Sequence, residues 1–176
     1  IDTPGAYPGV DAEERGQASA IATNLEEMFG IKAPLMAVVI GEGGSGGALA
    51  LGVADKVYML EYAIYSVISP ESCASILWSD PKMAETSANS LRLSAPEALE
   101  LGVIDTIISE PSGAAHQDHE RAAELIKKQF VTDLTKLQKQ DLDNLLAKRF
   151  AKFRAMGQKA IDFSADKFLY AAPSAE

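Results

Sequence analysis

An uninterrupted apolar run followed by a glycine-rich turn governs how this chain can fold. Residues 35–40 read Leu-Met-Ala-Val-Val-Ile, which is typical of a strand buried on both faces in an α/β sheet. Residues 41–47 then hold five glycines, and the apolar residues 48–53 are sufficient for one or two turns of buried helix. Glycines allow another group to approach the backbone closely. Because the first N–H groups of a helix are unpaired and lie at the positive end of its dipole, we expect the turn to hold a phosphate, a carboxylate or a developing oxyanion.

The segment before this turn predicts a loop and a helix. Residues 1–9 contain two prolines and two glycines, and a rigid loop of this kind after a strand end is where α/β proteins place ligands. A helix is expected to begin at a capping box formed by Asp11 and Glu14 and to end at Gly30. Its apolar face would comprise Ala18, Ile21, Ala22, Leu25, Met28 and Phe29. Loop, helix and strand together make half of a βαβ crossover.

Downstream of the turn, short apolar runs alternate with capping residues. Strands are predicted at residues 56–60, 63–68 and 103–109. Pro70 and Glu71 suit the first turn of a helix, whereas residues 79–92 are polar and indicate helix and loop. Ser94 and Glu97 have the spacing of a second capping box.

From about residue 120 the pattern changes to that of amphipathic helices. One apolar stripe comprises Ala122, Ile126, Phe130, Leu134 and Leu137, and another comprises Leu142, Leu146, Phe150 and Phe153. We expect these helices to pack on the flank of the domain, with a subunit interface as the alternative. The predicted organisation is a core at residues 1–115, a helical region at 116–160 and a flexible tail at 161–176.

The charge is unevenly distributed along the 176 residues. The chain has a net charge of −9, with −11 in residues 1–115 and +2 in residues 116–176. An acidic core disfavours nucleic acid as a partner and makes the core a poor sole host for a polyphosphate. The mildly basic C-terminal region is most simply a solvated helical surface, and contact with an anion is the alternative.

Composition narrows the class of protein further. A single cysteine, Cys73, excludes a disulfide framework and a cysteine-based zinc site within this chain. No apolar stretch has the length of a membrane span, and no charged-then-apolar leader is present. The sequence also opens on Ile1 rather than methionine, so we expect the later part of a longer, soluble protein from a reducing compartment.

Two sequence motifs overlap in the turn, and each predicts a different chemistry. Gly41, Gly43 and Gly46 satisfy the dinucleotide-binding pattern, but Gly52 interrupts the helix that this pattern requires. Residues 43–47 also satisfy the nucleophile-elbow pattern of serine hydrolases, with Ser45 as the nucleophile. The base would have to be His116 or His119, and both are more simply solvated loop residues. A third interpretation uses only the backbone, in which the N–H groups of Gly46 and Gly47 stabilise an oxyanion. A turn that merely packs closely on a neighbour is the structural alternative.

Four ordered segments carry a family resemblance. They are Ile-Asp-Thr-Pro-Gly-Ala-Tyr-Pro-Gly at 1–9, Glu-Glu-Arg-Gly-Gln at 13–17, Gly-Glu-Gly-Gly-Ser-Gly-Gly-Ala at 41–48, and Tyr-Ser-Val-Ile-Ser-Pro-Glu at 65–71 with Cys-Ala-Ser-Ile-Leu-Trp at 73–78. In this order they closely resemble the α subunits of the bacterial-type acetyl-CoA carboxylase carboxyltransferase. The resemblance is dense over residues 1–115, looser beyond, and lacks the N-terminal portion of that family.

The resemblance implies an α/β, crotonase-like fold of repeated ββα units with C-terminal helices. It also implies transfer of a carboxyl group from carboxybiotin, held on a separate carrier protein, to acetyl-CoA. The product would be malonyl-CoA, made in the first committed step of fatty acid synthesis. The N–H groups of Gly46 and Gly47 would polarise the ureido oxygen of biotin, and the exposed biotin nitrogen would take the methyl proton of acetyl-CoA.

The remaining expectations concern the pocket and the partners. The loop Gly5, Ala6 and Tyr7 and the turn residues Gly43, Gly44 and Ser45 would form the substrate pocket, and Glu71 would be structural. The implied assembly is a cytoplasmic α2β2 heterotetramer within an ATP-dependent complex. Its β subunit carries a zinc ribbon, a biotin carboxyl carrier protein delivers the cofactor, and no metal is expected in this chain. The alternatives are another crotonase-like acyl-CoA enzyme that acts alone, and a non-catalytic interaction subunit.

Overall fold

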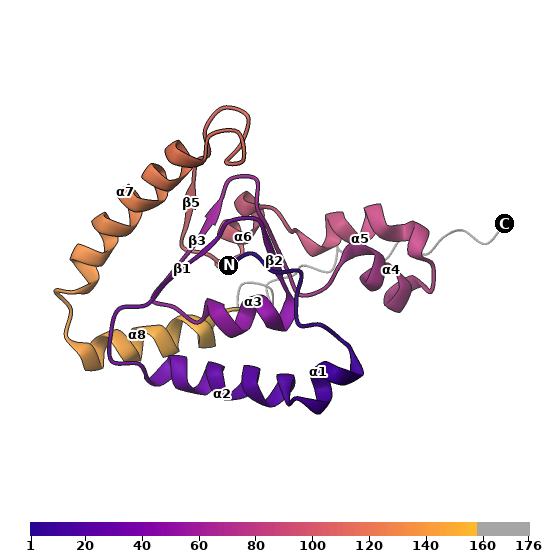
Figure 1. Cartoon of the computed structure of the whole chain (residues 1–176), viewed down its shortest axis with the longest axis horizontal. Helices are drawn as coiled ribbons and strands as arrows, with labels where there is room; N and C mark the ends of the chain where they lie inside the picture. Colours follow the sequence, from indigo (N-terminus) through magenta and orange to yellow (C-terminus); the bar gives the residue numbers. More distant parts are fainter. Residues whose placement is uncertain (158–176) are drawn as a thin grey trace.

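A computed structural model describes residues 1–157 as two small parallel sheets surrounded by helices (Figure 1). The strands are β1 (Met36–Val39), β2 (Glu42–Gly44), β3 (Lys56–Leu60), β4 (Ile64–Ser66) and β5 (Thr106–Ile108). The larger sheet has the order β1-β3-β5, and the smaller one pairs β2 with β4. Isolated bridges extend the smaller sheet on both sides, from Thr3 to Gly43 and from Ile64 to Ser94. The expected α/β class is therefore confirmed, and the expected tail at residues 161–176 lies outside the described residues.

The hydrophobic core is centred on β3 rather than on the apolar run at residues 35–40. Residues 57–60 of β3 are all buried, because this strand lies between β1 and β5. In β1 only Ala37 and Val39 are buried, whereas Met36 and Val38 are half-buried. The expectation that residues 35–40 are buried on both faces is thus wrong for one face, since β1 forms the edge of the sheet over the described residues.

The N-terminal helical segment is broken in two, contrary to the single helix that we expected. Helix α1 (Val10–Glu14) begins after Gly9 without a side-chain cap, so the predicted capping box of Asp11 and Glu14 is wrong. Helix α2 (Gln17–Gly30) begins after Gly16, which adopts a left-handed conformation with φ of 75°. Such a conformation ends a helix and is accessible to glycine at little cost.

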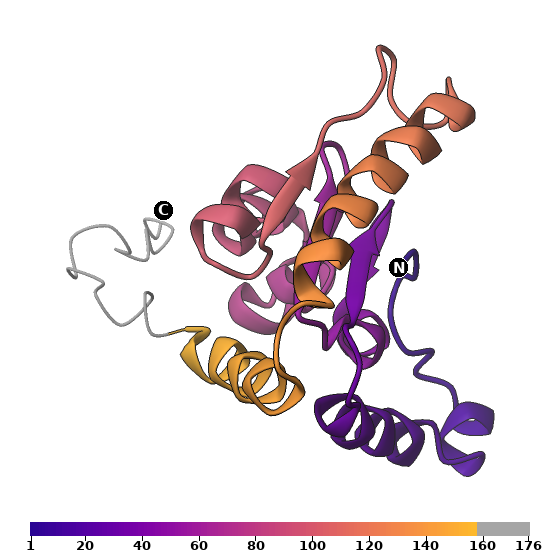
Figure 2. The same ribbon diagram turned by 90° about the vertical axis from the view of Figure 1, so that its left-hand side faces the viewer.

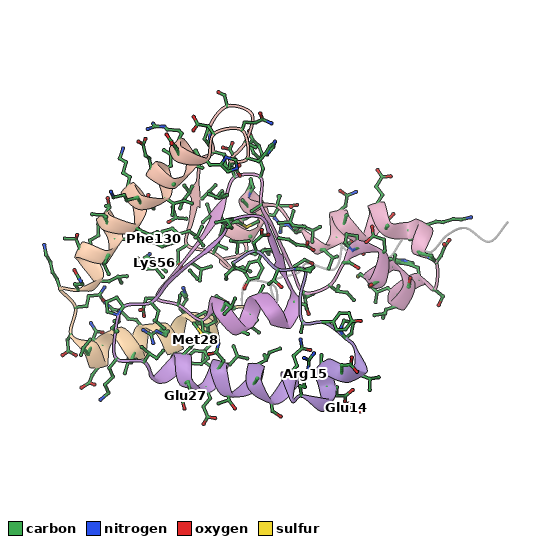
Figure 3. All side chains as sticks on the ribbon, viewed as in Figure 1. Glu14, Arg15, Glu27, Met28, Lys56 and Phe130 are labelled. Carbon is green, nitrogen blue, oxygen red and sulfur yellow. The ribbon has the colours of Figure 1, made fainter. Side chains whose placement is uncertain are left out.

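Helix α2 covers α3 (Ser45–Gly52) only partly, and α3 in turn lies against the sheets (Figure 1). Figure 3 shows Met28 on the side of α2 that faces α3 and Glu27 on the opposite side. Ile21, Leu25, Met28 and Phe29 are half-buried as predicted, but Ala18 and Ala22 are exposed. Since no α2 residue is fully buried, α2 forms an outer layer rather than part of the core.

The middle of the chain follows the predicted caps closely. Helix α4 (Pro70–Trp78) begins at Pro70 as predicted, and the side chain of the preceding Ser69 accepts a hydrogen bond from the N–H of Ser72. A short 3₁₀ turn, η1 (Pro81–Met83), leads into α5 (Ala84–Leu91), and these elements lie to one side of the sheets (Figure 1). Helix α6 (Ala95–Glu100) has the predicted capping box, formed by Ser94 and Glu97.

Two C-terminal helices, α7 (His119–Leu137) and α8 (Leu142–Ala155), pack against the core from different sides (Figures 1 and 2). The predicted stripe of α7 is confirmed, and Phe130 packs on Tyr58 of β3 with ring centroids 5.1 Å apart (Figure 3). The predicted stripe of α8 is only partly correct, because Phe150 is 59% exposed while Leu145 and Arg149 are buried.

Arg149 is buried because every donor of its guanidinium has an acceptor. It forms a two-pronged ion pair with Asp55, with N–O distances of 2.9 and 2.8 Å. The remaining donors bind the carbonyl oxygens of Met28, Ile31 and Ala33 at 2.7 to 2.9 Å, just where α2 ends. Arg149 therefore satisfies carbonyls that a helix end leaves unpaired and fixes α8 to the corner between α2 and β1.

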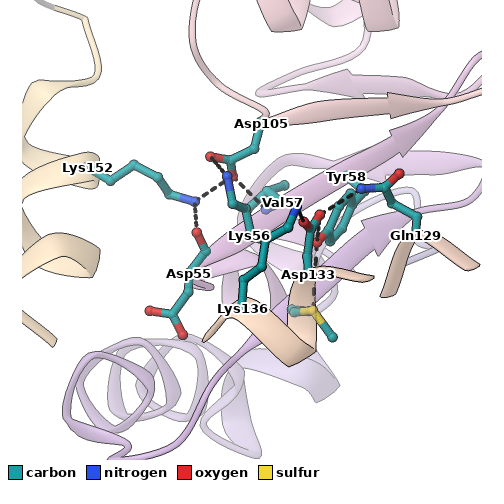
Figure 4. Close-up of polar contacts among 10 residues, drawn as sticks. Asp55, Lys56, Val57, Tyr58, Asp105, Gln129, Asp133, Lys136 and Lys152 are labelled. Atoms are coloured by element: carbon teal, nitrogen blue, oxygen red, sulfur yellow. Dashed lines mark hydrogen bonds and ion pairs between the residues drawn. The ribbon is translucent and has the colours of Figure 1, made fainter. Parts of the chain in front are cut away.

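A second polar cluster joins α7 to β3 (Figure 4). The Asp133 carboxylate accepts hydrogen bonds from Tyr58 at 3.0 Å, Gln129 at 2.7 Å and Lys136 at 2.9 Å. Burial by itself would raise the pKa of Asp133, but the hydrogen bonds from Lys136, Gln129 and Tyr58 together lower it. Burial and the neighbouring carboxylate raise the pKa of Tyr58, so the pair holds one proton, on the phenol, at neutral pH.

Candidate functional site

The glycine turn is built as a short strand, a single turning residue and a helix. Strand β2 lies between Thr3 and β4, with the Gly44 N–H donating to the Thr3 carbonyl at 2.8 Å. A Cβ at Gly44 would lie 2.3 Å from the Pro4 carbonyl, and one at Gly43 would lie 2.8 Å from the Tyr65 ring. Neither distance is possible for a side chain, so these two glycines are required by the close approach of both neighbours.

Gly46 and Gly47 lie in the first turn of α3, yet their surroundings differ. A Cβ at Gly46 would meet nothing within 4 Å, so this residue faces open space. A Cβ at Gly47 would lie 2.7 Å from the Gly5 carbonyl carbon and 2.9 Å from the Ala6 nitrogen. The first N–H groups of a helix have no partner inside it, and no loop or strand carbonyl within residues 1–157 accepts from these two. Both amides are therefore available to an acceptor outside the helix.

Ser45 is the turning residue, and its backbone is in the left-handed region with φ of 48°. A serine in this conformation between a strand and a helix has the backbone placement of a nucleophile elbow. However, the Ser45 hydroxyl makes no hydrogen bond with any residue from 1 to 157. His116 and His119 are both exposed, the first in a loop and the second at the start of α7, and neither lines the pocket beside Ser45.

A pocket of about 340 Å³ opens beside the turn. Its lining comes from four regions of the chain: Ser45, Gly46, Leu49, Tyr65, Ser66, Val67, Leu91, Arg92, Ala98, Leu101 and Val103. Most of these side chains are apolar, and burial raises the pKa of Tyr65, which stays neutral. Arg92 is the single cation of the lining, and it pairs with Glu97 and Glu100 of α6. The arrangement suits a largely neutral ligand with one oxygen that can accept hydrogen bonds from the helix start.

The structure gathers most of the predicted site residues around the turn, but Gly47 is not among the residues that line the pocket. Ser45 and Gly46 line the pocket, while Gly43 and Gly44 lie behind it within β2. Gly5, with φ of 128°, and Ala6 pack against the turn. The Tyr7 side chain is 71% exposed and does not reach the pocket lining.

Several lining residues were not predicted, and the sequence offers little signal for most of them. Tyr65, Ser66 and Val67 belong to a segment that carried the family resemblance, so they could have been named. Arg92 follows α5 in a polar stretch and adopts φ of 55°, for which the sequence shows no signal. Glu71 is exposed in the first turn of α4 and lies outside this lining.

Within residues 1–157, no three or more His, Cys, Asp or Glu side chains gather where they could hold a metal ion. Over the same residues, no helix has both the length and the apolar character that crossing a membrane requires.

Comparison with solved structures defines the class of fold. The structure of a Pseudomonas malonate decarboxylase hetero-dimer matches 92% of this chain and 64% of its own with a TM-score of 0.65 at 17% identity. A transcarboxylase 12S structure matches 72% of this chain and 26% of its own with a TM-score of 0.56 at 23% identity. Together with the parallel sheets and the glycine turn at the start of α3, these matches show the crotonase-like fold that we expected.

Sequence comparison then identifies the family. Residues 1–157 match the family described as acetyl co-enzyme A carboxylase carboxyltransferase-like, and the chain belongs to this family. It is 56% identical over 157 residues to the acetyl-coenzyme A carboxylase carboxyl transferase subunit alpha of Fusobacterium nucleatum. It is 52% identical over 160 residues to the protein of the same name from Geobacter metallireducens. The matches cover 89% and 91% of this chain, which spans about half the length of these curated relatives.

Proposed function

We propose that this chain is part of the α subunit of a biotin-dependent acetyl-CoA carboxyltransferase. The subunit would transfer a carboxyl group from carboxybiotin to acetyl-CoA and yield malonyl-CoA. Membership of the family and 52–56% identity to proteins named subunit alpha support this proposal. The single structural observation that supports it is the first turn of α3, where the N–H groups of Gly46 and Gly47 donate to no loop or strand carbonyl of residues 1–157 and Gly46 lines an apolar pocket.

The chemistry and the volume of the pocket support the ring of biotin as its proposed ligand. A urea-containing ring is neutral, offers one strong acceptor oxygen and suits a pocket that is largely apolar and about 340 Å³ in volume. When bound, carboxybiotin supplies the carboxyl group that is transferred. The N–H of Gly46 would donate to an oxygen that gains negative charge as this group leaves, and fixed donors favour such a charge most where water is excluded.

The residues around the turn would act by holding these donors in position. Gly5 and Ala6 pack against Gly47, so the loop restrains the second amide of the helix start. Pro4 packs against Gly44 and restrains the strand before it. This chain would then need no side chain as a base, which is consistent with two exposed histidines outside the pocket lining.

The proposed partners follow from the same family membership. We propose that a zinc-ribbon-bearing β subunit completes the active site in an α2β2 assembly. A biotin carboxyl carrier protein would deliver the cofactor, and the complex would act in the cytoplasm. These partners and the cellular site rest on the relatives' names and on the family, not on contacts within residues 1–157.

Two substitutions at Gly46 test the proposal in the full-length subunit mixed with its β partner. Gly46→Ala keeps the N–H and adds a methyl group into open space, whereas Gly46→Pro removes the N–H in the first turn of α3 and also restricts the backbone of Ser45 before it. We expect malonyl-CoA formation to fall about 100- to 1,000-fold in the proline variant and far less in the alanine variant. Equal activity of the two variants, with circular dichroism spectra like that of the wild type, would contradict the role of this amide.

A further inference from the structure

A second pocket lies between α8, the end of α7 and the start of β3. It has a volume of about 310 Å³ and is lined by Asp55, Lys56, Leu137, Gln140, Leu145, Lys148, Arg149 and Lys152. None of these residues lines the pocket beside the glycine turn. Four of the eight are cationic in a chain whose net charge is −9, so this pocket differs in sign from the protein around it.

The carboxylates near the pocket neutralise only part of this charge. Asp55 is fully engaged by Arg149, so that pair contributes no net charge. Asp105 faces two ammonium groups, Lys152 at 2.9 Å and Lys56 at 3.6 Å (Figure 4). Lys148 makes no ion pair with any residue in the described part of the chain, and its ammonium donates to the Gln140 side chain at 2.9 Å. Counted over residues 1–157, four cations against two carboxylates leave the pocket with an excess of two positive charges.

The floor of the pocket strengthens the effect of this excess. Leu137 and Leu145 are 5% and 2% exposed, so the lysine head groups lie over apolar, poorly polarisable material. An apolar wall focuses the field of nearby charges and strengthens their interaction with a counter-ion. Burial lowers the pKa of Lys152 despite the attraction of Asp105, which indicates that this ammonium lacks part of the solvation that an anion would replace.

We propose that this pocket binds the phosphate group of a small molecule through Lys56, Lys148 and Lys152. The excess of two positive charges matches a phosphate dianion rather than a single carboxylate. Lysine binds phosphate as a point charge, and three lysines on two elements can surround one group. The apolar floor formed by Leu137 and Leu145 would contact whatever is esterified to the phosphate.

Calorimetric titration of the full-length subunit, at constant ionic strength, tests this proposal with three probes. Inorganic phosphate and phenyl phosphate carry the dianion, and benzoate carries a single charge on a similar ring. We expect saturable binding of both phosphates and binding of benzoate that is at least about tenfold weaker. Tighter binding of phenyl phosphate than of phosphate would identify an organic phosphate as the ligand, and equal binding would identify the free ion. No saturable phosphate binding, or equal affinity for benzoate, would overturn the proposal.

Substitutions of single lysines show where on the protein phosphate binds. Lys148→Gln removes a charge that has no ion-pair partner within residues 1–157, at an exposed helical position, and we expect phosphate affinity to fall about tenfold. Lys127→Gln on the exposed side of α7 is the matched control and should leave affinity unchanged. Lys56→Gln is a second variant that should weaken binding similarly, and thermal unfolding verifies that each variant is folded. Equal phosphate affinity of Lys148→Gln, Lys56→Gln and Lys127→Gln would place the ion elsewhere and refute the assignment.

Discussion

Replacing Arg149 by methionine should destabilise the protein strongly. The substitution keeps a long side chain but removes the ion pair with Asp55, whose side chain is 4% exposed. It also leaves the carbonyls of Met28, Ile31 and Ala33 without their donor. Removing one partner of a buried ion pair costs about 3–5 kcal/mol, because the other charge stays buried without compensation. Since a typical domain is stable by about 5–15 kcal/mol, this loss is a large share of the total.

Urea unfolding followed by circular dichroism measures this loss. With a slope of about 2 kcal/mol per molar urea, a loss of about 4 kcal/mol lowers the midpoint by about 2 M. Arg154→Met is the matched control on the same helix, where the side chain is exposed, and it should change stability by less than about 0.5 kcal/mol.

A double-mutant cycle with Asp55→Asn isolates the ion pair from the carbonyl contacts. Asparagine removes the buried charge, so the double variant should be more stable than the sum of the two single losses predicts, by about 0.5–3 kcal/mol. An Arg149→Met variant within about 1 kcal/mol of Arg154→Met would refute the reasoning. It would show that α8 is not fixed to the corner before β1 through this side chain.

Three further predictions concern the turn and the cap of α6. Gly47→Ala should displace the loop at Gly5, with a loss of stability of about 1–3 kcal/mol in urea unfolding, whereas Gly46→Ala should leave stability nearly unchanged. Ser45→Ala should retain carboxyl transfer within about tenfold in the reconstituted complex, because a backbone oxyanion site needs no hydroxyl nucleophile; a loss of several orders of magnitude would support the hydrolase alternative. Ser94→Ala should cost about 0.5–2 kcal/mol at pH 7. The Ser94 hydrogen bond lowers the pKa of Glu97, so the stability that it contributes is present above the ordinary pKa of a glutamate. This stability is lost as the pH falls through the lowered pKa of Glu97 in the folded protein. The Ser94→Ala variant should therefore lose less stability than the wild type on acidification, as urea unfolding at pH 7 and at acidic pH would show.

Local capping chemistry was predictable from the sequence, whereas breaks and pairings between distant segments were not. The starts of α4 at Pro70 and of α6 after Ser94 depend on residues within three positions, and both were predicted. Strand β2 was missed because glycine is depleted in strands and its pairing depends on Thr3 and on β4, which lie far away in the sequence. Gly16 was read as part of a helix, although glycine at this position allows the left-handed break.

Buried charge was the other feature that the sequence concealed. Arg149 lies in a helix with many charged residues, so its spacing favoured an exposed position over a core one. Its acceptors are separated from it by 94 to 121 residues, and no local pattern reveals them. The glycine turn was predictable as a site. For the same reason as Arg149, Leu49, Leu91 and Arg92 of the pocket lining were not predictable.

The most direct test removes the Gly46 amide proton without changing the side chain. A backbone ester at residue 46, introduced in the full-length subunit by an α-hydroxy acid, replaces the N–H by an oxygen and leaves Ser45 free to keep its left-handed conformation. We predict that carboxyl transfer to acetyl-CoA with the β partner falls at least about 100-fold, while the same replacement at the exposed Leu51 has little effect. Undiminished transfer by the residue-46 ester would contradict the claim that this amide stabilises the reacting oxygen.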